Sequence, residues 1–200
     1  MKALVDIGQE LTSTLELDEL LDRLLRISRE VFCYQNAIIR LVDFERGVLE
    51  TVASYGYTAE AISQQIHLGQ GVMGKAALQG KPVLVEDVRE LPSYIPGISG
   101  ARSELAAPML VKDKVIGVFS VESHRPGAFA EEDIDPLMTV ASFAAIAIDN
   151  ARLYARLKEM SGRYQNLHQF NRRILQSVNL GIYTVDEQKR ITSWLSLIHI

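Results

Sequence analysis

Residues 103–151 read SELAAPMLVKDKVIGVFSVESHRPGAFAEEDIDPLMTVASFAAIAIDNA, and they predict two strands, a tight turn and a long helix. Apolar residues recur at every second position on both sides of the polar turn at 112–114, as is typical of a β-hairpin. Most positions on both faces are apolar, so we expect side chains to cover both faces of this sheet. The polar exceptions share one face and are Glu104, Ser120 and Glu122. Polar side chains on a covered sheet indicate a pocket beneath one cover.

The helix expected from residue 134 onward has two apolar stripes, about 120° apart on a 3.6-residue period. Acidic residues at 131–133 suit the positive end of its dipole. The first stripe consists of Ile134, Leu137, Met138, Ala141, Ala145 and Ile148. The second consists of Val140, Phe143, Ala147 and Tyr154. One stripe can lie on the sheet, so we expect the other to contact a second partner, either another helix or another subunit.

The segments SELAAPMLVKDKVIGVFSVES, PGAFAEED and ASFAAIAIDNARLYARL together resemble the C-terminal half of a GAF domain. The resemblance extends back to about residue 1 and implies a sensory GAF domain over residues 1–155. It implies an α+β fold with a central antiparallel sheet of roughly five or six strands and helices on both faces. GAF domains bind very different molecules, so the resemblance does not identify a ligand.

The composition favours a globular chain in the cytoplasm. Of the 200 residues, 48% are apolar and 23% charged, the net charge is −4, and there is one cysteine. An acidic balance argues against a nucleic-acid surface, which needs a basic face. Purely apolar runs are far shorter than the ~20 residues of a membrane span, and the N-terminus lacks an apolar signal core. We therefore expect a cytoplasmic protein that binds neither nucleic acid nor membrane.

A helix and a hairpin are expected before the central stretch. Leucines spaced three to four residues apart predict a helix from 17 to about 32, after a short amphipathic piece near 4–11. Residues 36–42 and 48–55 then predict the two strands of a first hairpin.

Two residues in this part of the chain need separate interpretation. Arg40 shares a strand face with Ile38 and Val42. Its head either reaches water at a sheet margin or acts as a pocket cation that binds an anionic ligand through charge-assisted hydrogen bonds. Cys33 directly follows the helix, and we expect it to be a small, buried and inert thiol.

Residues 69–74 formally match the GxGxxG pattern of dinucleotide-binding proteins. That pattern needs an apolar strand before it and a complete βαβ unit after it, and neither is present here. In GAF domains a similar Gly-Val-x-Gly opens a short helix beside the pocket, and we prefer this interpretation. Gly80 is expected to end that helix, and residues 83–85 to form the next strand.

Residues 87–100, DVRELPSYIPGISG, have the composition of a pocket lid or an irregular connection. They resemble the variable segment that closes over the ligand in many GAF domains. We expect polar side chains to converge beneath this loop and to bind a ligand; they are Arg40, Tyr55, Tyr94, Arg102, Ser103, Glu104, Ser120 and Glu122. For residues 102–104, a solvated strand edge with a local ion pair is an equal alternative.

The sequence carries no catalytic or metal-binding signature. The four histidines lack metal-ligand spacing, and there is no Walker A loop. The resemblance implies that the GAF branch which reduces free methionine sulfoxide uses several cysteines, whereas this chain has Cys33 alone. We therefore expect no enzymatic activity.

No cofactor is identified. The cysteine that attaches bilin in GAF photoreceptors corresponds to residues 87–101, which contain no cysteine, so covalent bilin is not expected. Haem bound through His67 or His124 is a disfavoured alternative.

A heptad seam continues from the helix; it consists of Leu153, Leu157, Met160, Tyr164, Leu167, Asn171, Ile174 and Val178. The spacing predicts a coiled-coil linker at 156–178 and a parallel homodimer through the helices of residues 134–178. The alternative is a connector that packs on its own domain. Residues 179–200 resemble the truncated start of a PAS domain, and we expect 195–200 to be a non-native tail.

These features imply a cytoplasmic sensory module of a multidomain signal-transduction protein, expected to be a sensor histidine kinase. The module would bind a small ligand and transmit the signal through a dimeric helix. The alternative is a ligand-free dimerisation or structural module in a diguanylate cyclase or a transcription activator.

Overall fold

The computed structural model describes residues 17–30, 33–177 and 182–195. The amphipathic piece expected near residues 4–11, Val178 of the heptad seam and most of the suspected tail lie outside the described residues. The chain divides into two compact units, Met1–Tyr154 and Ala155–Ile200.

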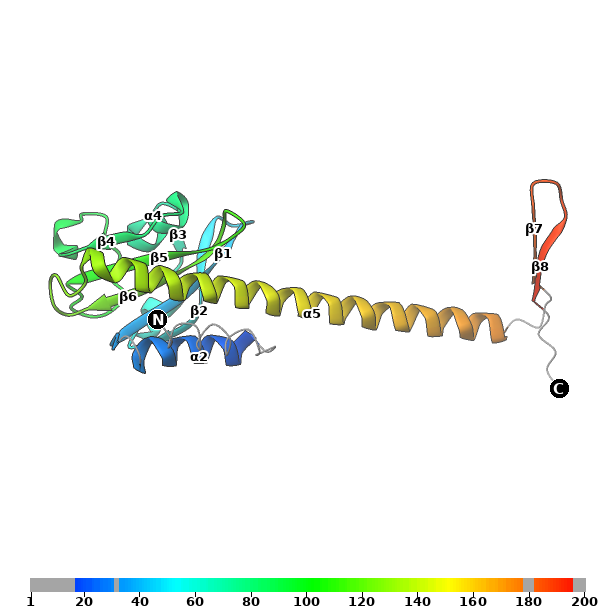
Figure 1. Ribbon diagram of the computed structural model, residues 1–200, viewed down its shortest axis with the longest axis horizontal. Helices are drawn as coiled ribbons and strands as arrows, with labels where there is room; N and C mark the ends of the chain where they lie inside the picture. The colour runs from blue at the N-terminus through cyan, green and yellow to red at the C-terminus, as the bar shows by residue number, and fades with distance from the viewer. Residues whose placement is uncertain (1–16, 31–32, 178–181, 196–200) are drawn as a thin grey trace. The chain divides into compact units, whose positions relative to one another are not determined.

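The first unit is built on a six-stranded antiparallel sheet, as predicted (Figure 1). Its strands follow the order β3 (Ile66–His67), β2 (Val48–Tyr55), β1 (Asn36–Asp43), β6 (Lys114–Ser123), β5 (Ser103–Val111) and β4 (Val83–Val85). Both predicted hairpins, β1–β2 and β5–β6, are present. The β5–β6 turn places Lys112 and Asp113 at φ 47° and 64°, as a type I′ turn requires.

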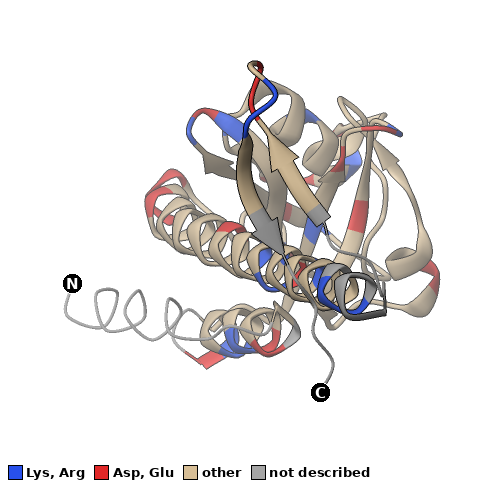
Figure 2. Cartoon of the chain, turned by 90° about the vertical axis from the view of Figure 1, so that its right-hand side faces the viewer, with Lys and Arg blue, Asp and Glu red and all other residues tan. Residues whose placement is uncertain are grey.

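One face of the sheet is covered by α2 (Leu17–Glu30) and by the first part of α5 (Ile134–Ser177) (Figure 1). The short 3-10 helix η2 (Glu131–Asp133) directly precedes α5, and its three acidic residues give the red ribbon at that end of the helix (Figure 2). Val140 and Ala147 of the second stripe are only 1% and 2% exposed and belong to the same buried cluster as Leu20 and Leu24 of α2. At these positions the second stripe is therefore covered within the chain, which agrees with the alternative of another helix rather than another subunit.

The opposite face is covered by shorter segments. They are α3 (Ala59–Ser63), α4 (Gly71–Gln79), and the loop that contains the 3-10 helix η1 (Val88–Glu90). Val72 and Ala76 of α4 pack against Val118 of β6, so the glycine-rich segment forms the predicted short helix beside the sheet. Gly80 ends α4 in the left-handed conformation at φ 63°, as expected for a helix C-terminus.

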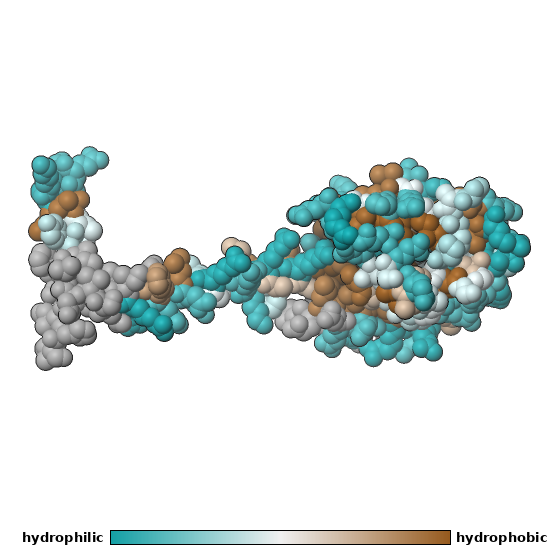
Figure 3. Space-filling view, turned by 180° about the vertical axis from the view of Figure 1, so that it is seen from behind, coloured by the Kyte–Doolittle hydropathy of each residue, from teal (hydrophilic) through white to brown (hydrophobic). Residues whose placement is uncertain are grey.

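The helix α5 continues from the first unit into the second. Its exposed apolar side chains follow the predicted seam and include Leu157, Met160, Tyr164 and Leu167. Brown side chains accordingly interrupt the teal surface of this helix in Figure 3. The helix reaches Ser177, but the coiled coil itself stays a prediction.

One helical stretch, Glu131–Phe170, is long and apolar enough to cross a membrane by length and composition alone. Our search for uninterrupted apolar runs did not detect it. Of its most apolar window, 44% is buried inside the protein, and the core helix of a globular domain passes the same test. The stretch is therefore weak evidence for a membrane span.

In the second unit, β7 (Ile182–Val185) and β8 (Ile191–Leu195) form a hairpin. Asp186 holds the turn, because its Oδ1 accepts hydrogen bonds from the backbone N–H groups of Gln188 and Arg190, each at 2.9 Å. This is the strand–turn–strand order expected from the PAS resemblance, which stays a prediction.

Candidate functional site

Four charged or polar side chains lie buried on the α4 side of the sheet, among apolar neighbours. Arg40 of β1, Glu104 of β5 and Glu122 of β6 are each 1% exposed, and Ser120 of β6 is fully buried. Glu104 and Glu122 are direct cross-strand partners in the β5–β6 register. Two carboxylates therefore lie next to each other inside the protein, a destabilising arrangement if both are ionised.

The loop of residues 87–101 lies directly on Glu122. The Oε2 atom of Glu122 accepts hydrogen bonds from the Ile98 N–H at 2.9 Å and from the Tyr94 hydroxyl at 3.3 Å. Its Oε1 atom is buried and has no hydrogen-bond partner. Gly97 packs so closely that a Cβ atom there would overlap Glu122 and the Tyr57 ring. We expected a lid over a ligand cavity, whereas the loop rests directly on the carboxylate.

The environment shifts the pKa values of both carboxyl groups upward. Burial raises the pKa of Glu122 to about 7, although hydrogen bonds from the loop and from the Tyr57 hydroxyl act in the opposite direction. Burial and the neighbouring Glu122 raise the pKa of Glu104 well above its usual range. The Ser120 hydroxyl partly offsets this, because it donates a hydrogen bond to Glu104 Oε1 at 2.7 Å. The pair therefore tends to retain a proton near neutral pH.

Arg40 is not at a sheet margin, and its head is enclosed. Its Nη1 atom donates to the Gln64 carbonyl at 2.5 Å, and Nη2 donates to the Ala61 carbonyl at 2.7 Å. These carbonyls lie at the C-terminal end of α3, which attracts a cation. Burial lowers the Arg40 pKa, while Tyr57, Glu104 and Glu122 act to raise it. Its Nε atom is buried without a partner.

Of the eight predicted site residues, the structure brings five together: Arg40, Tyr94, Glu104, Ser120 and Glu122.

The other three predicted site residues lie elsewhere. Tyr55 shares the opposite face with its cross-strand partner Ala37, and its hydroxyl donates to the Tyr34 carbonyl. Ser103 precedes Glu104, so the alternation of the strand turns it to that same opposite face, where its hydroxyl donates to the Arg125 carbonyl at 2.8 Å.

Arg102 forms a local ion pair, which was the alternative to lining the pocket. Its Nη2 atom lies 2.8 Å from Oδ2 of Asp87, at the start of the loop. Arg89 and Arg102 together hold the pKa of Asp87 well below its usual range.

Two residues of the cluster were not predicted. Thr51 lies opposite Arg40 in the β1–β2 register, and its Oγ1 atom is buried without a partner. The Tyr57 hydroxyl is also buried, and it lies beside the Glu122 carboxylate. Burial raises the Tyr57 pKa most, and Glu122 raises it further. The β1–β2 register shifts between Ile39 and Arg40, so the residues of β2 on either side of the shift do not follow one strict alternation of faces. A sequence pattern based on alternation cannot detect such a shift.

A surface groove of about 450 Å³ lies next to the cluster. One wall is formed by α3 and its flanks, and the other by residues 96–99 of the loop. Arg40 holds the first wall through Ala61 and Gln64, and Glu122 holds the second through Ile98. The groove therefore offers a route to the cluster if the two walls move apart.

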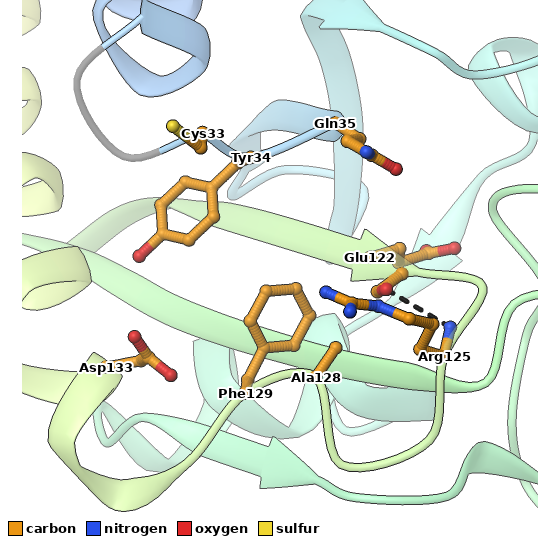
Figure 4. A pocket seen from close by; sticks show the side chains of 9 residues that line it. Cys33, Tyr34, Gln35, Glu122, Arg125, Ala128, Phe129 and Asp133 are labelled. Atoms are coloured by element: carbon orange, nitrogen blue, oxygen red, sulfur yellow. Dashed lines mark hydrogen bonds between the residues drawn. The ribbon is translucent and has the colours of Figure 1, made fainter.

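A second cavity, of about 230 Å³, includes Cys33, Tyr34 and Phe129 among its lining residues (Figure 4). Cys33 is exposed, which contradicts our expectation of a buried thiol. The Glu122 side chain points away from Tyr34 and Phe129 in Figure 4. The Arg40–Glu122 cluster is the stronger candidate site because buried polar atoms in it lack partners.

Comparisons of sequence and of structure with known proteins agree on one family. The sequence matches the family model for the GAF domain over residues 14–149. Free methionine-R-sulfoxide reductase of Escherichia coli (strain K12) is 33% identical over 69 residues, which are 34% of this chain and 42% of that protein. The anaerobic nitric oxide reductase transcription regulator NorR of Aliivibrio fischeri is 25% identical over 177 residues, 84% of this chain and 34% of that protein. The chain thus spans less than half the length of either relative.

Solved structures agree with this comparison. Free methionine-R-sulfoxide reductase from Neisseria meningitidis, in complex with its substrate, superposes with a TM-score of 0.69 at 26% identity, covering 76% of this chain and 89% of that one. The GAF domain of a phosphoenolpyruvate-protein phosphotransferase from Acinetobacter gives a TM-score of 0.68 at 24% identity, covering 76% and 93%. At 24% identity, the similarity to the Acinetobacter domain supports a shared fold and no shared function.

These relatives overturn the expectation that the chain has no enzymatic activity. A reductase is similar to it both in sequence and in structure. The absence of a recognisable catalytic signature was therefore not a valid reason to exclude an enzyme, because function resides in individual side chains that a fold can exchange.

Proposed function

Since this chain belongs to the GAF domain family, we propose that it is a sensory module that binds a small polar molecule at the Arg40–Glu122 cluster. The observation that supports this proposal is the pair of unpartnered buried atoms Arg40 Nε and Glu122 Oε1. A buried polar atom without a partner costs about 1–3 kcal/mol, and more when the group is charged. A ligand that supplies the missing partners removes this cost.

Transmission of the signal is proposed to pass through β6. Ser120 and Glu122 of this strand belong to the site, while Phe119 and Val121 pack into the cluster that contains α5. A ligand that displaces β6 therefore acts directly on the packing of α5. It can bias this packing only by its different affinity for two arrangements of the helix.

The seam on α5 supports the proposal of a parallel homodimer through residues 134–178. Leu157 and Leu167 are 64% and 56% exposed, so the described part of the chain leaves most of these large apolar side chains uncovered. Coiled-coil pairing of two such helices buries an a/d seam of this spacing.

We propose that the complete protein is a cytoplasmic signalling protein with an output domain. A sensor histidine kinase is the expected output. A transcription regulator is the second candidate, and it is favoured by the alignment of NorR over 84% of this chain. A diguanylate cyclase has no support among the relatives described above.

The ligand proposal is tested on the full chain by thermal denaturation with a panel of metabolites. Free methionine-R-sulfoxide is the first compound to include, because it is the substrate named for the reductase relatives. A ligand that binds only the folded state raises the melting temperature. At a ligand concentration of a hundred times Kd, it adds about 2.7 kcal/mol to the free energy of unfolding. Conversion of the sulfoxide in the presence of a thiol reductant would add an enzymatic role.

The control variant is Glu50→Gln, since this carboxylate is exposed on β2 and lies outside both the cluster and the groove, and it should leave the ligand-induced rise in melting temperature unchanged. Native mass spectrometry of the purified protein identifies any molecule that it retains. If no compound changes the melting temperature and no retained molecule is found, the ligand-free dimerisation module is the correct alternative.

A further inference from the structure

Beyond the sheet unit, α5 is basic, although the chain as a whole is acidic. Residues 155–177 contain five lysine or arginine residues and one acidic residue, whereas the net charge of the whole chain is −4. The acidic residue, Glu159, is already bound within its own helix, since its Oε1 atom lies 2.7 Å from Nη2 of Arg163. Two copies of this helix that pair along their seams therefore bring a surplus of positive charge together. Any further positive charge beside the seam weakens the pairing.

The heptad register places His168 beside the seam. Tyr164 and Leu167 are consecutive a and d positions, so Arg163 is a g position and His168 is an e position. In a parallel two-stranded coiled coil, a g residue faces the e residue that lies five positions later in the partner helix. Arg163 therefore faces His168 of the partner subunit, and the twofold axis repeats this contact on the other flank of the pair.

The neighbours of His168 on its own helix do not stabilise a positive charge. Residues 160–177 contain no acidic residue. Arg172 lies one turn after His168, at the i,i+4 spacing at which like charges repel each other. Tyr164, Gln165 and Gln169 line a hollow on the helix surface together with His168, and all three are uncharged. His168 and Arg172 are both exposed. In a parallel dimer, a protonated imidazole thus faces arginine on its own helix and across the seam.

We propose that His168 makes the α5 dimer sensitive to pH: the neutral imidazole permits pairing, and the protonated imidazole weakens it through repulsion from Arg163 of the partner subunit. This inference rests on the proposed parallel homodimer and adds a means of regulating it. A histidine side chain changes its charge between about pH 5 and 8. Because the separated chains bind this proton more tightly than the dimer does, the dimer should weaken as pH falls through that range. Acidification therefore acts on the same helix pair that is proposed to carry the ligand signal.

The test is the dissociation constant of the full chain, measured by fluorescence-detected sedimentation at pH about 5.5 and about 8. A dye on Cys33, the one cysteine of the chain, which is exposed, allows measurement from picomolar to micromolar concentrations. Two like-charge contacts per dimer should make the dissociation constant about two- to fivefold larger at the lower pH. The difference should disappear in about 0.5 M salt, because salt screens exposed charges.

Three variants assign the effect to particular residues. His168→Gln removes the titrating group and should give the same dissociation constant at both pH values. Arg163→Glu should reverse the direction of the change, because the protonated imidazole then faces a carboxylate of the partner subunit. His67→Gln removes an exposed histidine of β3, outside α5, and should retain the full difference. Glu122 also titrates in this range, but its contribution is common to all of these proteins.

The outcomes separate this inference from the proposed function. A dimer of the unaltered chain that is equally strong at both pH values contradicts the pH-sensitive contact, while the proposed dimer stands. Retention of the pH difference in His168→Gln, or an unreversed difference in Arg163→Glu, also overturns it. If the unaltered chain is monomeric at tens of micromolar at both pH values, the proposed dimer and its regulation are both wrong.

Discussion

At the scale of single residues, Glu122 is one of two buried carboxyl groups that make stability depend on pH. Its pKa is 4.5 in an unperturbed chain and about 7 in the folded protein, so the folded state binds the proton more tightly. The stabilisation is complete below pH 4.5 and is lost as pH rises through about 7. This difference in pKa corresponds to at most about 3–4 kcal/mol of stability. Urea denaturation of the unliganded protein at acidic and alkaline pH measures it.

Glu122→Gln should reduce this dependence, because glutamine does not titrate, while Glu104 retains its own contribution. Glu50→Gln on the exposed side of β2 is the matched control and should retain the slope. A stability that rises between pH about 5 and about 8 in the unaltered protein would contradict the raised pKa.

The buried cluster could be predicted from the sequence only where the strands are regular. Period-two alternation placed Glu104, Ser120 and Glu122 on one face, and the structure agrees. Tyr55 was assigned wrongly because a register shift in β1–β2 changes the face, and such a shift leaves no trace in composition. Tyr57 was missed because it lies beyond Tyr55, the last residue of β2, where the alternation of a strand no longer applies.

At the scale of elements, the loop of residues 87–101 depends on the missing side chain at Gly97. We expect Gly97→Ala to lift the loop, because the added Cβ overlaps Glu122 and Tyr57. The Ile98 amide then loses its carboxylate acceptor and should exchange its hydrogen faster. A loss of about 1–3 kcal/mol in stability is expected from overpacking of this kind.

Hydrogen exchange measured by NMR or mass spectrometry gives the protection of Ile98. The control is Gly162→Ala in α5, where no atom lies near the added Cβ and helix propensity favours alanine by about 1 kcal/mol. Unchanged protection of Ile98 in Gly97→Ala would show that the loop does not rest on Glu122.

The exposed seam of α5 gives a second prediction at this scale. Leu157→Lys combined with Leu167→Lys should convert the proposed dimer into folded monomers, because charged side chains at a and d positions cannot be buried together. Gln165→Lys combined with Gln169→Lys adds the same charge on exposed positions away from the seam and should leave the dimer intact. Sedimentation velocity distinguishes the two results. A monomeric unaltered chain at tens of micromolar would refute the parallel dimer.

Most elements could be predicted from the sequence, whereas their partners could not. Leucine spacing and alternation gave α2 and both hairpins with nearly correct bounds. The second apolar stripe of α5 could be assigned only to another helix or another subunit, and Val140 and Ala147 are in fact buried within the chain. A stripe indicates that a face is covered, but the identity of the cover depends on tertiary packing.

At the scale of the whole molecule, the two compact units should differ in stability. The β7–β8 hairpin exposes Tyr183, Val185 and Ile191, and an isolated two-stranded hairpin is marginally stable at best. Removal of residues 179–200 should therefore leave the main melting transition of the chain unchanged. Differential scanning calorimetry of the full and shortened chains tests this. A lower melting temperature for the shortened chain would show that the hairpin stabilises the sheet unit.

The two faces of β6 have a consequence for how this protein can diversify. Val118, Ser120 and Glu122 face the polar cluster and its surroundings, whereas Phe119 and Val121 face the buried layer with α5. Recognition and transmission are thus encoded at interleaved positions of one strand. Exchange of the even-numbered residues can create a receptor for a different molecule, while the odd-numbered residues preserve the mechanical connection to the helix.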